Sequence, residues 1–247
     1  MKCLPTLLLV ITNIVNRSLE GAFMPNALKC TMITPLLKKS NLDPEEFKNL
    51  SSVSNLPFTS KFIEKTVAAQ LMQNIGKNNL SEKLQSAYKK LHSTETTLLK
   101  VQDDILRAVD NGGTAVLLYC LIYQQLLMLL TTVYYSTDFK IWFGIKGRVF
   151  AWFKSYLAGQ SQFVSLTGPS SSKSDLMYGV LQGSILGPIS YLLYTFPFGE
   201  DIRRHNMNFH FYTDDSQVYF LFNSDSSVIM PRIEACLHDI AKWMSLT

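Results

Sequence analysis

The sequence predicts an α+β domain whose antiparallel sheet carries its helices on one face. Residue patterns with helical spacing crowd the first half of the chain, while the second half follows a mixed βαββα order. The 247 residues are 47% hydrophobic and 17% charged, which is the composition of a folded protein that can bury a core. No internal repeat or low-complexity segment interrupts either half.

The first sixty residues begin with an apolar run and are then divided by prolines. Met1–Val15 has a lysine followed by apolar residues, which predicts a buried amphipathic helix, with a signal peptide as the alternative. Polar residues within the run favour the helix, as does the lack of a small-residue cleavage site. Pro25, Pro35, Pro44 and Pro57 then predict short helices and extended pieces.

Three longer segments have the spacing of amphipathic helices, namely Phe58–Gly76, Thr94–Val109 and Arg148–Leu157. The Asn-Gly-Gly sequence at 111–113 gives the second of them a stop signal. One side of that second helix is expected to carry its apolar residues, which are Leu98, Leu99, Val101, Ile105 and Leu106.

Alternating apolar and polar residues predict strands in the second half of the chain. Gln162–Leu166 and Lys173–Val180 are expected to pair with each other, and Asn208–Phe222 is expected to form a hairpin around a polar turn. Gly187–Tyr194 and the residues from Pro231 onward predict helices.

Charge and cysteine content limit the function classes only weakly. A net charge of +4 and a pI near 8.8 suit a polyanionic partner without requiring one. The four cysteines stand far apart with no CxxC pair, so neither a zinc site nor a disulfide framework is indicated, and reduced thiols are expected.

An uncharged stretch separates Asp110 from Asp138, and Ala115–Tyr135 within it is long enough to span a bilayer. Gln124 and Gln125 at its middle weaken that interpretation. A membrane protein with a single span through residues 115–135 is therefore the least favoured function considered, and an intracellular location in the cytoplasm or nucleus is favoured over the membrane.

Asp214 and Asp215 stand at the predicted hairpin turn. Two adjacent carboxylates on such a turn can hold Mg²⁺, which prefers one or two carboxylates together with substrate phosphates. The alternative is an ordinary turn, because aspartate is common in turns for conformational reasons. Taken alone, the pair favours the ordinary turn.

Gly179–Pro188 is a glycine-rich loop that enters a predicted helix. Glycines allow a close approach of the backbone to a nucleotide or template strand, and the start of a helix offers backbone N–H groups to phosphate. The segment has no Gly-Lys-Ser/Thr sequence and is not a Walker loop. A plain strand–turn–helix corner is the alternative.

In combination, Gly179–Pro188 followed by Tyr212–Asp215 resembles the pattern GVPQGSxLGP … YADD of reverse transcriptases. Further segments resemble the family in the same order, and these are Thr34–Pro44, Val53–Pro57, Leu84–Leu99, Arg148–Gln162 and Ile233–Met244. The chain therefore resembles the reverse transcriptase, or RNA-directed DNA polymerase, of a vertebrate non-LTR (LINE-type) retrotransposon.

The resemblance implies a right-hand polymerase fold, with helical fingers over residues 1–112 and an antiparallel palm sheet over residues 113–247, ending before a thumb. It implies RNA-templated DNA synthesis that uses Mg²⁺, deoxynucleotides, an RNA template and a DNA primer. Asp214 and Asp215 would be catalytic and would hold the metal ions. The residues that would contact template or nucleotide are Gln182, Gly183, Tyr212 and Lys89.

The chain departs from the family where the first catalytic aspartate is expected. The family's strand VLLDLSAAFDTVDH corresponds here to Val116–Thr132, which holds no carboxylate. A one-base shift of the reading frame converts codons for such a motif into codons for Cys120–Thr131, and this is our hypothesis for residues 113–138. The DNA encoding Tyr119–Thr137 is then expected to hold the motif one base out of frame. The resemblance thus predicts a degenerate, inactive enzyme, because a two-ion site needs that carboxylate.

A nucleic-acid-binding remnant without catalysis is the other function considered. It would hold RNA through basic residues, which are Lys38, Lys39, Lys89, Lys90, Arg203 and Arg204. Ordinary surface charge is the favoured interpretation of these residues.

Overall fold

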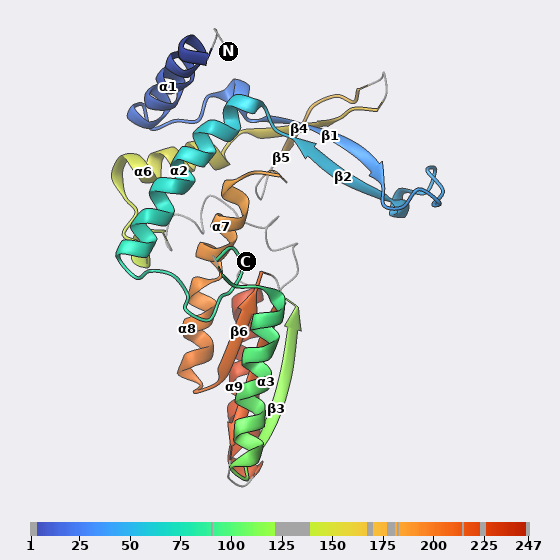
Figure 1. Ribbon diagram of the computed structural model, residues 1–247, viewed down its shortest axis with the longest axis vertical. Coiled ribbons are helices and arrows are strands. Elements are labelled where there is room, and N and C mark those ends of the chain that lie inside the picture. Colours follow the sequence, from blue (N-terminus) through green and yellow to red (C-terminus); the bar gives the residue numbers. More distant parts are fainter. Residues whose placement is uncertain are drawn as a thin grey trace. The chain divides into compact units, whose positions relative to one another are not determined.

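The computed structural model describes residues 4–89, 91–121, 139–166, 170–176, 181, 183–213, 215–222 and 226–245 (Figure 1). The chain divides into two compact units. The first unit combines residues 1–78 with residues 127–189, and the second combines residues 79–126 with residues 190–247. Mixed helix and antiparallel strand pairing confirm the α+β class.

The first unit opens with helix α1, Leu4–Glu20, which contacts α2 and α6. The predicted helix is confirmed, but its expected burial is wrong, because the side chains from Leu7 to Val10 are all at least half exposed. Only its C-terminal half is anchored. Val15 and Ser18 are buried, and the Ser18 hydroxyl accepts a hydrogen bond from the indole N–H of Trp152 at 2.9 Å.

Helices α2, Phe58–Lys77, and α6, Gly147–Leu157, confirm the helices expected in these places. The buried apolar residues of α2 follow one another at helical spacing and are Ile63, Val67, Ala68, Leu71 and Ile75. The buried side of α6 is largely aromatic, and Trp152 stacks on Tyr156 with ring centroids 5.4 Å apart.

A four-stranded sheet of order β2-β1-β4-β5 completes the first unit. Its strands are β1 Cys30–Leu37, β2 Leu50–Asn55, β4 Gln160–Val164 and β5 Ser174–Leu176. β1 pairs with β4 in parallel and the other pairs are antiparallel, so the expected antiparallel pairing of β4 with β5 is confirmed. The short 3-10 helices η1, Asn26–Leu28, and η2, Phe47–Asn49, fit the expectation of short pieces between the prolines.

The second unit contains a three-stranded antiparallel sheet of order β3-β7-β6. β6, Asn208–Tyr212, and β7, Asp215–Phe222, form the predicted hairpin. β3, Thr114–Leu121, lies along the other side of β7 over that strand's whole length. The central strand β7 is thus held on both sides.

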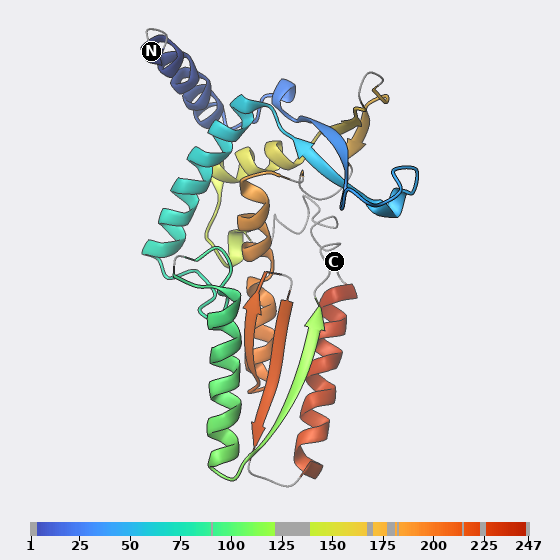
Figure 2. The same ribbon diagram turned by 45° about the vertical axis from the view of Figure 1, so that its right-hand side comes forward.

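Helices lie on both faces of this sheet, so the expectation of helices on one face is wrong for the second unit. Successive side chains of a strand point to opposite faces. The Tyr219 hydroxyl donates to Asp104 of α3, Thr94–Asp110, at 2.6 Å on one face. On the other face Phe211 stacks on Phe198 of α8, Phe196–Arg204, and that ring in turn stacks on Trp243 of α9, Ser226–Ser245. Figure 2 shows the sheet between α3 and α9.

Two expectations about these helices need correction. α3 begins at the Ser93 cap, but it packs through Thr97 and Val101, and three of the apolar residues expected on its buried side, Leu98, Leu99 and Leu106, are more than half exposed. α9 begins at Ser226, so Pro231 lies inside the helix and not at its start, and its ring leaves one internal hydrogen bond of the helix unmade. Helix α7, Leu186–Tyr194, confirms the helix expected after the glycine-rich loop.

The possible membrane span begins within a strand. Residues 115–121 belong to β3, and residues 122–135 lie outside the described part of the chain. Among the residues that the structure describes, no helix has the length and apolar character needed to cross a membrane.

Candidate functional site

The candidate catalytic residues stand at the turn that joins β6 to β7. Tyr212 pairs with Asp215, which is the first residue of β7. Thr213 has a left-handed backbone with φ of 53°, and its hydroxyl donates to the Tyr212 carbonyl at 2.6 Å. Asp214 lies outside the described residues. The hairpin therefore holds Asp215 at its tip, as the alternating sequence predicts.

Strand β3 brings the altered segment next to this turn. Its last residue, Leu121, pairs with Asp215, and Cys120 pairs with Ser216. This strand is the one to which the resemblance assigns a catalytic carboxylate, and its sequence from Thr114 to Leu121 contains none. Within the described ranges no group of three acidic, histidine or cysteine side chains is placed to hold a metal ion.

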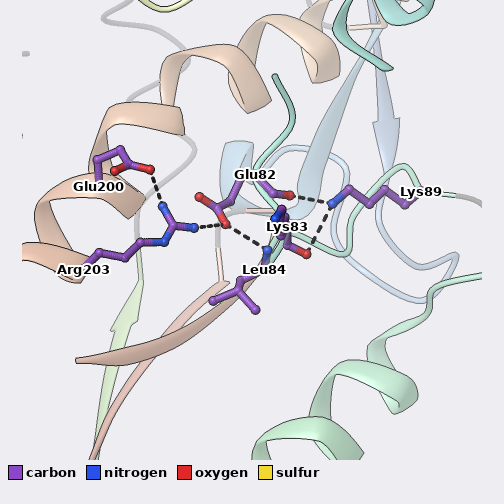
Figure 3. A network of polar contacts seen from close by, with 6 residues as sticks. All are labelled: Glu82, Lys83, Leu84, Lys89, Glu200 and Arg203. Atoms are coloured by element: carbon purple, nitrogen blue, oxygen red, sulfur yellow. Dashed lines mark hydrogen bonds and ion pairs between the residues drawn. The ribbon is translucent and has the colours of Figure 1, made fainter. Parts of the chain in front are cut away.

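Lys89, expected at a phosphate, has its ammonium group hydrogen-bonded to its own loop. Its Nζ donates to the Glu82 carbonyl at 2.5 Å and is 3.5 Å from the Lys83 carbonyl (Figure 3). Burial lowers the pKa of Lys89, and the negative charge of Glu82 opposes that shift. In this arrangement the lysine closes the 82–89 loop.

Arg203 is held in an ion-pair network with two acids (Figure 3). It contacts the carboxylate of the buried Glu82 and donates to Glu200 at 2.6 Å. Burial acts to lower the pKa of Arg203, but the hydrogen bond and charge of Glu82, with those of Glu200, raise it on balance. The guanidinium also lies over the Phe209 ring.

Two of the other basic residues considered for RNA binding are engaged by groups of the chain itself. Arg204 pairs with Asp201, and the Lys38 ammonium donates to the Lys48 carbonyl at 2.8 Å. Lys39 is exposed, and Lys90 lies outside the described residues. Most of these charges are thus engaged within the chain itself.

The glycine-rich loop belongs to the first unit, whereas the hairpin belongs to the second. Gly183 has φ of 78°, and a Cβ atom added there would lie 3.1 Å from the Ser54 carbonyl oxygen. Glycine is therefore required both by the backbone conformation and by the close approach of β2. Gln182 and residues 177–180 lie outside the described part of the chain.

The N–H groups at the start of α7 are occupied by the protein itself, so the expectation that they are open to phosphate is wrong. Glu64 of α2 is fully buried, and its Oε2 accepts from the Ser184 hydroxyl at 2.7 Å and from Ile185 N at 2.8 Å. Leu186 N is 3.3 Å from the same oxygen. The carboxylate fills the place where an anion would bind at a helix N-terminus.

Sequence reasoning missed two of the residues that shape these sites. Glu64 lies within a helix whose apolar spacing gave no hint that one buried position carries an acid. Gln85 lies within a segment that resembles the family, and its buried side chain contacts the turn before Asp214. That resemblance was the available signal for Gln85.

Comparison with known proteins finds two similar polymerases of mobile elements. The chain is 26% identical over 200 residues to the probable RNA-directed DNA polymerase from transposon X-element of Drosophila melanogaster. It is 24% identical over 225 residues to the RNA-directed DNA polymerase from mobile element jockey of the same organism. The matches cover 79% and 91% of this chain, and no model of a protein family matches it.

These matches support a reverse transcriptase-like region, in agreement with the resemblance of the sequence to reverse transcriptases. The chain spans about a fifth of the length of the relatives, with 21% of the X-element polymerase and 23% of the jockey polymerase aligned.

Proposed function

We propose that this chain is the fingers and palm part of a non-LTR retrotransposon reverse transcriptase and that, as written, it does not catalyse DNA synthesis. Residues 1–112 correspond to the fingers and residues 113–247 to the palm of a right-hand polymerase. The observation that carries the proposal is the pairing of β3 with β7, which puts Leu121 opposite Asp215. The strand that should supply a carboxylate beside the hairpin is in place and carries none.

In the intact enzyme that the proposal describes, Asp214 and Asp215 would hold Mg²⁺, which would supply the charge stabilisation of a two-ion phosphoryl transfer. Gln182, Gly183, Tyr212 and Lys89 contact the RNA template or the incoming deoxynucleotide. The described donors of this chain do not fit that metal site, since Asp215 has leucine opposite it on β3. A hard cation such as Mg²⁺ needs oxygen ligands, which an aliphatic side chain cannot replace. No step through the metal follows for the chain as written.

The test is extension of a DNA primer on an RNA template with Mg²⁺ and deoxynucleotides. The purified chain is expected to give no extension, because loss of an essential member of a catalytic set lowers the rate by roughly three orders of magnitude or more. Robust extension by the chain as written would overturn the proposal of inactivity.

A repaired chain tests the proposed reading frame. In it, the segment Tyr119–Thr137 is replaced by the frame-restored sequence with its aspartates, and the sequence that follows the matched region in the relatives is fused after Thr247. We expect this chain to extend the primer and D214N to abolish that extension. The matched control is D175N on the exposed strand β5, which should retain it. A repaired chain that stays inactive would overturn both the frameshift account and the proposed polymerase function.

A further inference from the structure

Residues 82–87, named here the brace, run along the free side of β6. The Ser86 amide donates to the Phe211 carbonyl at 2.9 Å, and the Phe211 amide donates to the Leu84 carbonyl at 2.8 Å. Gln85 therefore forms a parallel bridge with Phe211. The brace therefore adds a hydrogen-bonded segment beside β6, and this segment lies close to the turn that precedes Asp214.

Gln85 joins the brace to the turn through its side chain. It is 3% exposed, and its Oε1 accepts hydrogen bonds from Ala87 N at 3.0 Å and from Thr213 N at 3.3 Å. Thr213 is the turn residue with the left-handed backbone, so this bond holds a conformation that residues other than glycine seldom adopt. A single side-chain oxygen thus binds two backbone amides from different segments.

The other end of the brace is anchored independently of the turn. Glu82 accepts from the Leu84 amide at 2.9 Å and pairs with Arg203 of α8 (Figure 3). Ser86 Oγ and His210 Nε2 share a hydrogen bond of 2.8 Å in the middle of the brace. The segment on both sides of Gln85 is therefore held by contacts that do not involve Thr213.

We propose that Gln85 is a positioning residue for the 212–215 turn, acting through its hydrogen bond to the Thr213 amide. It touches no reacting atom, and it sets the backbone from which the aspartates project. The inference rests on the proposed function for its link to DNA synthesis, while its structural part stands on the contacts within the second unit.

The first test measures amide hydrogen exchange in the chain as written. Q85M keeps the size of the side chain but removes the acceptor, so the Thr213 amide should exchange at least about tenfold faster. Q85E retains an acceptor oxygen and should preserve the protection. The Phe211 amide, which is bonded to the brace backbone, should stay protected in both variants and serves as the internal reference for folding.

The matched control is Q217M. Gln217 stands in β7 of the same sheet, and its Oε1 accepts no hydrogen bond from any described residue. Its replacement should leave Thr213 exchange unchanged. Equal exchange of the Thr213 amide in Q85M and in the unchanged chain would overturn the proposed bond.

The second test uses the repaired chain and separates positioning from a merely structural role. Q85M should lower kcat for primer extension about tenfold with KM for deoxynucleotide unchanged, and Q85E should restore kcat. Faster Thr213 exchange without a change in kcat would overturn the positioning role. If the repaired chain is inactive, the proposed function fails while the exchange experiment still decides whether Gln85 holds the turn.

Discussion

The glycine-rich loop and the 212–215 turn are the two motifs on which the resemblance depends, and they differ in how complete they are. At the loop, the buried carboxylate of Glu64 accepts hydrogen bonds from the N–H groups at the start of α7. At the turn, Asp215 faces Leu121 across the β3–β7 pair. In the first motif a side chain of the chain itself accepts from the helix N–H groups, whereas in the second the strand paired with Asp215 carries no carboxylate.

The comparison separates the backbone framework of a site from the side chains that a chemical function requires. β3 pairs with β7 over its full length although its sequence departs from the family, because strand pairing uses backbone groups that every residue other than proline provides. Metal binding depends instead on the identity of one or two side chains. A change of sequence can therefore remove the second property and leave the first.

The buried acids Glu64 and Glu82 allow the two units to be compared in a second way. Among the described residues, Glu64 in the first unit accepts from hydroxyl and backbone N–H groups, whereas Glu82 in the second unit has the charged partner Arg203. Removing a buried carboxylate leaves the groups that donated hydrogen bonds to it without an acceptor. We therefore expect the first unit to depend more strongly on its acid than the second unit depends on its ion pair.

The largest expected effect is that of E64A. This change leaves Ile185 N without its acceptor and leaves Leu186 N with the Ser184 hydroxyl alone. It also removes the bonds that the Ser60 hydroxyl at 3.0 Å and the Ser184 hydroxyl at 2.7 Å donate to Glu64. Each buried donor left unpaired costs about 1–3 kcal/mol, so the free energy of unfolding should fall by roughly 3 kcal/mol or more. Equilibrium unfolding in urea measures the change.

The control for this prediction is K65A, on the exposed side of the same helix, which should change stability by less than about 0.5 kcal/mol. E64Q keeps one acceptor oxygen and should lie between the two. Equal stability of E64A and K65A would show that α7 does not depend on this cap.

R203M should have an intermediate effect in the second unit. It removes the ion-pair partner of the Glu82 carboxylate, which has 5% of its side chain exposed, while the methionine still covers Phe209. Breaking a fully buried pair costs about 3–5 kcal/mol, and we expect about 2 kcal/mol here because 37% of the Arg203 side chain is exposed.

Arg204 provides the matched control, since it also pairs with an acid of its own helix but is 69% exposed. R204M should therefore have little effect on urea unfolding. Adding E82Q to R203M should recover part of the lost stability, because the uncompensated charge is removed. A loss from R204M as large as that from R203M would contradict the distinction.

Much of the fold could be predicted because its elements are local. The hairpin, α2 and α6 follow from the spacing of apolar residues, and each is confirmed. The side on which a helix packs depends on distant partners. Thus α3 turns Leu98 and Leu99 to solvent because its buried side is set by Val101 and by the bond that the Tyr219 hydroxyl donates to Asp104.

In the candidate site too, the local features could be predicted from the sequence and the long-range contacts could not. The turn at Asp215 could be predicted from alternation and from the resemblance, and the lack of an acid in β3 could be read directly. The acceptor that fills the start of α7 could not, because Glu64 lies far from Ile185 in the sequence and only folding brings them together. Ion pairs such as Glu82–Arg203 escape sequence analysis for the same reason.

The smallest expected effect is a pH dependence carried by His210 in the second unit. Burial lowers the pKa of His210, and the charges of Lys100 and Lys89 lower it further, with Asp104 acting in the opposite direction and His92 adding to the shift. The unfolded chain, with an ordinary histidine pKa of about 6.5, then binds more protons than the folded chain as pH falls through and below that value. Stability that is fully present above about pH 6.5 should therefore decrease toward lower pH.

H210Q, which cannot titrate, should show a smaller loss of unfolding free energy between about pH 7.5 and pH 5.5 than the unchanged chain, when both are measured by urea unfolding. H238Q, at an exposed position on α9, should leave the loss unchanged. An equal loss in H210Q and in the unchanged chain would assign the pH dependence to other groups.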